Sequence, residues 1–198
     1  MSAANMPPPP MKFTSADLLL MPDDGKRYEV IEGELYVAKQ PNWHHQYACT
    51  RLLWALEEWN NRTRLGVANL APGLIFAEDD DVAPDVVWIS NELLPKILGA
   101  DGKLHAAPEL VVEVLSPGWN NQHRDRQAKL KLYSRRGVLE YWLVDWEKPS
   151  VEIYRRENEQ LVQTSTLLRN DALTSPLLPG FACSVSDLIH RIPLEPQS

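Results

Sequence analysis

Two carboxylates stand in segments where strands are expected, and both need a chemical explanation. Glu113 lies within the apolar run Val-Val-Glu-Val-Leu, and Asp85 lies within Ala-Pro-Asp-Val-Val-Trp. An ionised carboxylate among buried aliphatic side chains is costly unless a cation or hydrogen-bond donors compensate it. Pro84 restricts the residue before it to extended conformations and marks where the second strand begins. Two such carboxylates near strand ends suit a metal ion.

Oxygen ligands of this kind favour Mg²⁺ or Mn²⁺ and disfavour zinc. These ions keep several waters and accept one or two carboxylates together with phosphate oxygens of a substrate. The alternative is structural: Asp85 caps a turn and Glu113 pairs with an arginine. Considered alone, the two carboxylates favour this alternative, and a third element, a lysine, shifts the balance.

The lysine lies on a helix expected over residues 124–136. At ~100° per residue, Asp125, Lys129 and Arg136 fall within the apolar stripe of that helix, whereas Lys131 falls on the opposite, solvated side. An exposed ion pair between Asp125 and Lys129 at i, i+4 would contribute only a few tenths of a kcal/mol. The placement of Lys129 on the packing face therefore favours a functional role.

The elements that must position these residues predict an α/β fold (α+β mixed sheet), with a central mixed sheet flanked by helices. The expected elements are a helical turn at 15–20, a hairpin at 27–39 turning at Glu32 and Gly33, a helix at 43–60, strands at 67–76, 82–90 and 110–115, the helix at 124–136, a strand at 139–145, edge strands at 151–154 and 161–168, and a helix at 186–190. The acidic run 78–81 suits an exposed turn between antiparallel neighbours. The succession of strand, helix and strand over 110–145 indicates a crossover unit.

Composition limits the class of protein. The 198 residues fit a single domain at 15–192, with a disordered Pro-rich leader at 1–14 and a disordered tail at 193–198. Cys49 and Cys183 have no metal-ligand spacing and support no disulfide framework, which favours a cytoplasmic protein. No signal peptide or membrane-spanning run is evident.

The charge balance bears on nucleic-acid binding. The net charge of −7 counts against non-specific attraction to a polyanion, although basic residues confined to one face could still bind one. The helix at 124–136 offers candidates for such a face, and an ordinary solvated helix surface is the alternative. These candidates are Arg124, Arg126, Lys131, Arg135 and Arg136.

Four motifs carry a family resemblance. They are Ala83-Pro-Asp85-Val, Pro108-Glu-Leu-Val-Val-Glu113-Val-Leu-Ser-Pro117, Asp125-x-x-x-Lys129-x-x-x-Tyr133 and Gly137-Val-x-Glu140-Tyr-Trp-Leu-Val-Asp145. Together they resemble the Uma2 family of restriction-endonuclease-like proteins, within the PD-(D/E)XK nuclease superfamily. The resemblance extends from about residue 28 to 145 and loosely onward to 189. It implies a restriction-endonuclease-like core.

The resemblance also implies roles for site residues. Asp85 and Glu113 would hold the metal, the carbonyl of Val114 would be a further ligand, and Lys129 would assist the nucleophilic water. The superfamily motif places its lysine two residues after the glutamate, where this chain has Leu115. We therefore expect Lys129 to supply the amine from the following helix.

Two further residues match family positions. Glu34 could bind a second ion or orient water, and it could equally be an exposed hairpin residue. His45 shares the apolar stripe of the helix at 43–60, which favours a core histidine that has its hydrogen bonds satisfied. His45 and Asp125, with Arg124, Arg126 and Arg136, are also candidates for substrate contact.

The expected function is a Mg²⁺- or Mn²⁺-dependent endonuclease that hydrolyses phosphodiester bonds of nucleic acid, with DNA favoured and a homodimer possible for double-strand cutting. One alternative is a nucleic-acid-binding or regulatory protein that keeps the fold and does not cut. A more distant alternative is a hydrolase of a small phosphate substrate. An acyl hydrolase is poorly supported because no Gly-x-Ser-x-Gly motif occurs.

Overall fold

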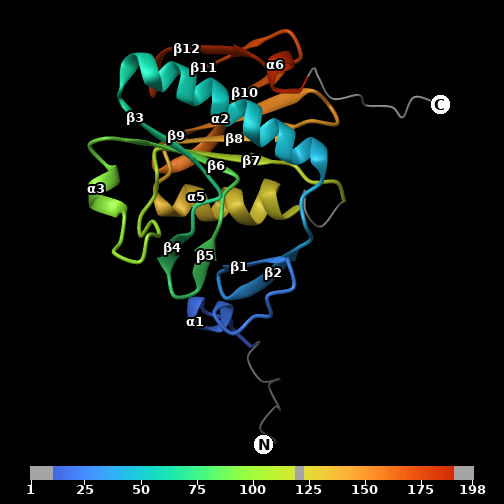
Figure 1. Cartoon of the computed structure of the whole chain (residues 1–198), viewed down its shortest axis with the longest axis vertical. Coiled ribbons are helices and arrows are strands. Elements are labelled where there is room, and N and C mark those ends of the chain that lie inside the picture. The colour runs from blue at the N-terminus through green and yellow to red at the C-terminus, as the bar shows by residue number, and fades with distance from the viewer. Residues whose placement is uncertain (1–10, 119–122, 190–198) are drawn as a thin grey trace, which may run out of the picture.

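A six-stranded mixed sheet forms the centre of the fold, with strand order β10-β9-β8-β7-β6-β3 (Figure 1). The computed structural model describes residues 11–118 and 123–189. Strands β7 and β8 run parallel, and the other neighbours in this sheet are antiparallel. The strands are β3 (Gly66–Leu70), β6 (Val86–Ser90), β7 (Leu110–Val114), β8 (Glu140–Asp145), β9 (Ser150–Glu157) and β10 (Gln160–Leu168).

Smaller elements surround the central sheet. A four-stranded antiparallel sheet has the order β2-β1-β5-β4, and β11 pairs with β12. Figure 1 shows the four-stranded sheet below the central one, on the side of the N-terminus. The bounds are β1 (Arg27–Ile31), β2 (Glu34–Ala38), β4 (Leu74–Ala77), β5 (Asp80–Val82), β11 (Ala172–Ser175) and β12 (Leu178–Ser184), with short helices α1 (Ser15–Leu18), α3 (Leu94–Ile97) and α6 (Val185–Ile189).

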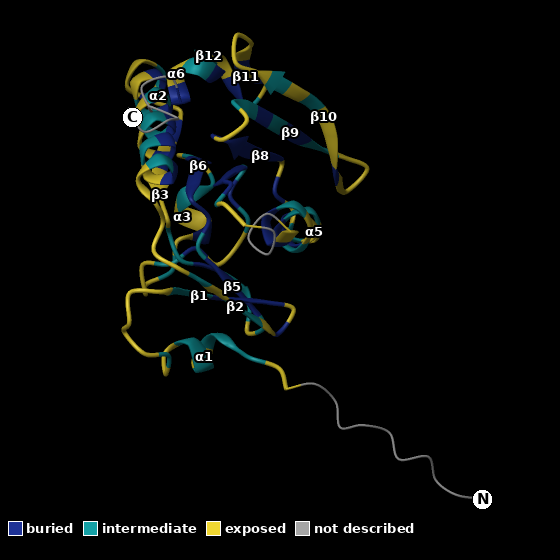
Figure 2. Cartoon of the chain, turned by 90° about the vertical axis from the view of Figure 1, so that its right-hand side faces the viewer, coloured by how far each residue is buried: buried dark blue, intermediate teal, exposed yellow. Residues whose placement is uncertain are grey.

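Helices cover both faces of the central sheet, as Figures 1 and 2 show. On one face lies α2 (Trp43–Thr63), and on the other lies the π-helical segment η1 (Arg124–Lys129), which continues into α5 (Leu130–Arg136). Side chains of a strand alternate between faces, so Val112 and Val114 pack toward α2 while Val111 packs toward α5. This two-sided cover explains the nearly continuous apolar run of β7 and confirms the mixed sheet flanked by helices.

Helix α2 follows directly from its sequence. Asn42 caps it by accepting a hydrogen bond from the backbone N–H of His45 at 2.9 Å. The predicted stripe is buried, as the list of buried helix residues shows: His45, Ala48, Cys49, Leu52, Leu56 and Trp59. Arg64, in the left-handed region with φ 54°, ends the helix. Among the described residues, no helix is long and apolar enough to cross a membrane.

The hairpin and the crossover were also predicted correctly. Strands β1 and β2 pair around the turn at Glu32 and Gly33, where Gly33 has a φ of 80°. Strands β7 and β8 flank η1 and α5 as a parallel pair. Within the expected leader, Phe13 donates a backbone hydrogen bond to Gly33 at 2.9 Å. Residues 1–10, and the expected boundary at 192 with its tail, lie outside the described residues.

Two strand predictions were wrong. The segment 67–76 is not one strand, because it divides at Pro72 and Gly73 into β3 of the central sheet and β4 of the four-stranded sheet. Likewise, 82–90 divides into the end of β5 and β6, with Pro84 in the interruption. Proline lacks the N–H that a continuous strand would need at this position.

Two further expectations need correction. The acidic run 78–81 is not wholly an exposed turn, because Asp80 and Asp81 are buried in β5 and only 78 and 79 form the turn. Strand β9 is not an edge strand, since it pairs with both β8 and β10. Its inner position was hidden by its partly polar sequence, in which polar side chains alternate with buried ones.

Replacing Leu56 by Ala should destabilise the protein by about 2–5 kcal/mol, because it removes a fully buried side chain and leaves a cavity. Trp54, two residues earlier on the same helix, is 55% exposed, and Trp54→Ala should cost less than about 1 kcal/mol. Urea unfolding monitored by circular dichroism gives both values. Equal losses would contradict the assigned orientation of α2.

Candidate active site

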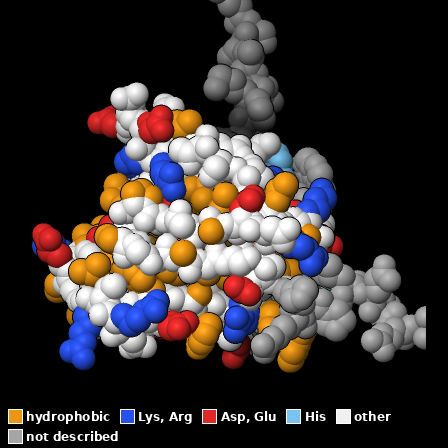
Figure 3. Space-filling model, turned by 90° about the horizontal axis from the view of Figure 1, so that it is seen from above, with side chains coloured by type: hydrophobic (Ala, Val, Ile, Leu, Met, Phe, Trp, Pro, Cys, Tyr) orange, Lys and Arg blue, Asp and Glu red, His pale blue; other side chains and the backbone are white. Residues whose placement is uncertain are grey.

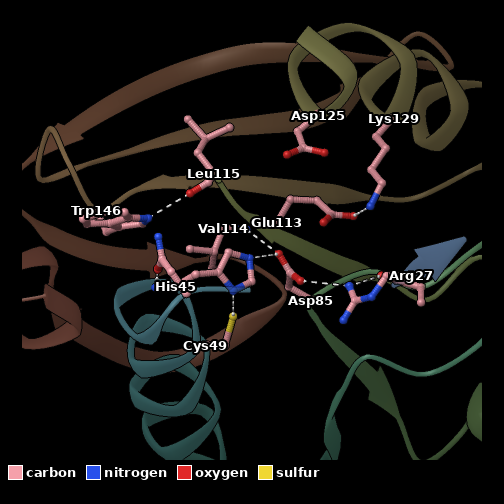
Figure 4. A network of polar contacts seen from close by, with 12 residues as sticks. Arg27, His45, Cys49, Asp85, Glu113, Val114, Leu115, Asp125, Lys129 and Trp146 are labelled. Atoms are coloured by element: carbon pink, nitrogen blue, oxygen red, sulfur yellow. Dashed lines mark hydrogen bonds and ion pairs between the residues drawn. The ribbon is translucent and has the colours of Figure 1, made fainter. Parts of the chain in front are cut away.

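The carboxylate of Glu113 accepts two hydrogen bonds from the helix opposite its strand. Lys129 Nζ donates to its Oε1 at 2.8 Å, and Tyr133 Oη donates to the same atom at 2.7 Å. All three side chains are buried. Because Glu113 lies on the face of β7 that η1 and α5 cover, the prediction that Lys129 points toward the sheet is confirmed (Figure 4).

Asp85 lies beside Glu113 because of strand pairing. The antiparallel register of β6 and β7 pairs Val86 with Val112, and its continuation by one residue places Asp85 opposite Glu113. Pro84 precedes Asp85, and β6 begins at Val86. This agrees with the prediction that Pro84 marks the beginning of a strand. The two carboxylates that the sequence singled out therefore meet where β6 begins and β7 ends.

Donors from three elements hold Asp85. Its Oδ1 lies 3.2 Å from Arg27 Nη1, and its Oδ2 lies 3.0 Å from His45 Nε2 and 2.9 Å from the backbone N of Val114 (Figure 4). His45 is buried, as expected for a core histidine, and its partner is this carboxylate. Helix α2, hairpin strand β1 and strand β7 thus all converge on Asp85.

Glu29, on β1, completes the cluster, and sequence reasoning missed it. Its Oε1 lies 3.0 Å from Lys129 Nζ and accepts a hydrogen bond from the backbone N of Ala83 at 2.9 Å. Arg124 Nη1 lies 3.7 Å from its Oε2. Lys129 therefore bridges Glu29 and Glu113, which come from different sheets. Charge pairing at this point joins the four-stranded sheet to the central one.

Glu34, the hairpin glutamate that the sequence suggested, is not brought into this cluster. Its side chain is exposed on β2 and accepts a hydrogen bond from Tyr36 Oη at 3.0 Å. A signal for Glu29 was present, because it lies between Tyr28 and Val30 in a strand. The same pattern of a carboxylate among apolar residues identified Glu113.

Arg124 is buried and does not form part of a surface, contrary to the prediction. Its Nε donates to Asp125 Oδ1 at 2.8 Å, and both side chains face inward. The expected helix starts as a π-helix, which has more residues per turn than an α-helix, so the 100° spacing did not apply to its first turn. Asp125 faces inward in the structure, as the sequence predicts.

The other basic residues of this helix are also paired. Arg126 binds Glu152, and Lys131 lies 2.9 Å from Glu32, while Arg135 and Arg136 both bind Asp80. They therefore do not form the free basic surface that the sequence suggested. On the opposite side of the molecule, the face seen from above in Figure 3 mixes acidic, basic and apolar side chains.

The environment moves the pKa values of the two central carboxylates apart. Burial raises the pKa of Glu113 to about 8, and the nearby charge of Asp85 adds to this effect, although Lys129 opposes it. Burial also acts on Asp85, but the hydrogen bond from His45 and the charge of Lys129 outweigh burial and lower its pKa. Divergent pKa values in adjacent carboxylates are typical of catalytic sites.

The donor set fits a divalent cation. In the described part of the chain, four carboxylates lie in the cluster, and their basic partners are two arginines, one lysine and His45: the carboxylates are Glu29, Asp85, Glu113 and Asp125, and the arginines and lysine are Arg27, Arg124 and Lys129. The charges of Asp85, Asp125 and Glu29 add to the effect of burial in raising the pKa of Glu113. Carboxylate oxygens are hard ligands, which suits Mg²⁺ or Mn²⁺.

A second group of possible ligands shares Asp85. One donor atom each from His45, Cys49 and Asp85 lies within 4.8 Å of the others. Burial raises the pKa of the Cys49 thiol far above its usual range, so the thiol stays protonated. Its Sγ lies 3.6 Å from His45 Nδ1, as in a hydrogen bond. We interpret this group as a hydrogen-bonded chain that orients His45 toward Asp85.

The fold and the cluster define a class. The described part of the chain has a restriction-endonuclease-like fold, a central mixed sheet flanked by helices, in which Asp85, Glu113 and Lys129 lie close together. The chain belongs to the Uma2 family, described as "Putative restriction endonuclease", whose model matches residues 15–186. Leu115, where the superfamily lysine would stand, packs in the apolar cluster beneath α5.

A solved structure shares this fold. A protein from Anabaena variabilis ATCC 29413, described as "a putative nuclease belonging to DUF820", is similar with a TM-score of 0.72 and 19% identity, over 90% of this chain and 98% of that chain. The type IIG restriction endonuclease BpuSI gives a TM-score of 0.41 and 14% identity, over 73% of this chain and 16% of that chain. No curated protein matches the sequence.

Replacing Lys129 by Met should cost about 3–5 kcal/mol of stability, because it leaves Glu113 and Glu29 buried without the cation that bridges them. Lys131→Met is the matched control: the Lys131 side chain is 67% exposed, and its loss should cost less than about 1 kcal/mol. Urea denaturation of both variants measures the difference. A loss at Lys129 no larger than that at Lys131 would show that the bridge does not stabilise the fold.

Proposed function

We propose that this protein is a metal-dependent endonuclease that hydrolyses phosphodiester bonds of DNA. The observation that carries the proposal is the buried contact between Lys129 and Glu113 beside Asp85, in a cluster that also contains Glu29 and Asp125. Membership of the Uma2 family supports the same conclusion. A cytoplasmic location is consistent with two unpaired thiols, Cys49 and Cys183.

Asp85 and Glu113 are the residues that would hold the metal, with the carbonyl of Val114 as a further ligand and Glu29 close by. When bound, Mg²⁺ or Mn²⁺ would lower the pKa of a water and offset negative charge on the phosphate. Tyr133 fixes the orientation of Glu113 by its hydrogen bond to Oε1. These contacts hold the ligands in place before an ion arrives, which limits the reorganisation that binding requires.

Lys129 supplies positive charge to the reaction. Although burial acts against the charged form, Glu113 and Glu29 raise the pKa of Lys129, so its ammonium stays protonated. A protonated amine does not act as a general base. We therefore assign Lys129 to hydrogen bonding of the attacking water and to stabilising charge on the phosphate oxygens.

Cleavage of both strands of a duplex would suit a dimer of this chain. The edge of the central sheet at β3 is unsuitable as the contact between the two copies. On β3, the backbone N of Gly66 is bound by Asn60 Oδ1 at 3.0 Å and that of Ala68 by Glu57 Oε1 at 2.9 Å. These side chains of α2 accept hydrogen bonds from the backbone N–H groups that a strand of a second copy would need in order to pair with β3. A dimer would therefore use another surface.

A nuclease assay tests the proposal. Wild-type protein should cut duplex DNA with Mg²⁺ or Mn²⁺ and should not cut it with EDTA. Asp85→Asn and Glu113→Gln should each lower the rate by about 100-fold or more, because each removes charge that would hold the ion. Glu92→Gln, at a side chain 87% exposed, is the control of matched chemistry.

Three outcomes of this assay discriminate between functions. Equal degradation by wild type and all variants would indicate contamination and would overturn the site assignment. Binding of DNA without cleavage would favour the alternative of a nucleic-acid-binding or regulatory protein. Cleavage of small phosphate esters without cleavage of DNA would favour the alternative of a hydrolase that acts on a small phosphate substrate.

Glu29 and Glu34 form a matched pair from one hairpin. Glu29→Gln should lower the cleavage rate by at least about tenfold, since loss of a group that orients a metal site commonly costs this much. Glu34→Gln should leave the rate within about twofold, because an exposed side chain outside the cluster contributes little. The reverse order in the same nuclease assay would restore Glu34 to the site.

A further inference from the structure

Arg27 is the cation of the cluster that reaches solvent. Its side chain is 32% exposed, whereas those of Lys129 and Arg124 are 1% and 10% exposed. Lys129 is bound between two carboxylates, and Arg124 contacts Asp125 and Glu29. Arg27 is therefore the one of these three cations that can change partner without unfolding the surrounding structure.

The contacts of Asp85 divide between its two oxygens. Oδ2 contacts His45 and the backbone N of Val114, which are both fixed parts of the fold. Oδ1 contacts Arg27 at 3.2 Å and, within the described residues, no other donor. The side of Asp85 that Arg27 covers is therefore the side where a cation can be exchanged.

The guanidinium of Arg27 is only partly used. Its hydrogen bonds to Asp85 and to the carbonyl of Ala83 at 3.1 Å both leave from Nη1. In the part of the chain that the structure describes, its other two nitrogens have no hydrogen-bond partner. A planar guanidinium with free donors is well suited to a phosphate, which it can bind through two parallel hydrogen bonds.

We propose that Arg27 neutralises Asp85 Oδ1 when no divalent ion is bound, and that it moves to a phosphate of the DNA when the ion takes its place. This inference rests on the proposed function. It assigns Arg27 two negatively charged partners in succession, first the carboxylate of Asp85 and then a phosphate of the DNA. Arg27 would thus weaken ion binding to the free protein and strengthen binding of substrate to the loaded site.

Direct binding measurements test the inference. Calorimetric titration with Mn²⁺ should show that R27Q binds the ion more tightly than wild type by about fivefold, since it removes a partly exposed competing pair. With Ca²⁺ present, fluorescence anisotropy should show that R27Q binds a labelled DNA duplex more weakly by about tenfold or more, since a charge-assisted hydrogen bond is lost. R27K should retain ion affinity near wild type and recover part of the DNA affinity.

Arg62→Gln is the matched control, because it removes the same charge from an exposed position on α2. It should change neither affinity by more than about twofold. Thermal melting checks that R27Q stays folded, which is expected because His45 and Val114 still bind Asp85.

The outcomes separate this inference from the proposed function. If wild type binds Mn²⁺ and R27Q binds it equally or more weakly, competition by Arg27 is refuted while the metal site stands. If R27Q binds Mn²⁺ more tightly but DNA equally well, the move to phosphate is refuted. If neither protein binds Mn²⁺, the proposed metal site fails and the inference fails with it.

Discussion

The buried ammonium of Lys129 is the interaction on which the rest of the site depends. It lies between Glu113 of the central sheet and Glu29 of the four-stranded sheet, with both contacts at 3.0 Å or less. A buried charge is tolerated only when its partners satisfy it closely. The same nitrogen therefore joins two sheets and places positive charge at the point where we propose chemistry. In the proposed function, one nitrogen atom therefore serves both stability and catalysis.

The two central carboxylates of the site differ in their pKa values. Burial raises the pKa of Glu113, whereas the hydrogen bond from His45 and the charge of Lys129 outweigh burial and lower the pKa of Asp85. The hydrogen bonds that distinguish the two carboxylates come from different elements, namely α2 for Asp85 and the α5 side for Glu113. A site of this kind is assembled before a ligand arrives, and an additional cation would relieve its electrostatic strain. The other basic residues of η1 and α5 are paired with carboxylates, so they do not form a free basic surface around the cluster.

Much of the fold was predictable because local patterns reflect how many faces of an element are covered. The stripe of α2, the apolar run of β7 and the hairpin at Gly33 each match the structure. The failures occur where neighbouring strands belong to different sheets. Residues 67–76 have the pattern of one strand, but β3 and β4 separate at Pro72 and Gly73. Hydrophobic periodicity reports burial and does not report which sheet a strand joins.

The sequence by itself determined that Asp85, Glu113 and Lys129 are buried charges that need partners, because the cost of burying a charge is local and visible in the surrounding residues. Only the tertiary structure decided which residues pair with these buried charges. Glu29 and Arg27 come from a hairpin more than fifty residues before Asp85, and the packing of that hairpin against β6 and η1 brings them together. The inward turn of Arg124 likewise depends on a π-helical start. Such meetings are set by sheet register and helix packing, which join residues distant in sequence and leave no periodic signal within either segment.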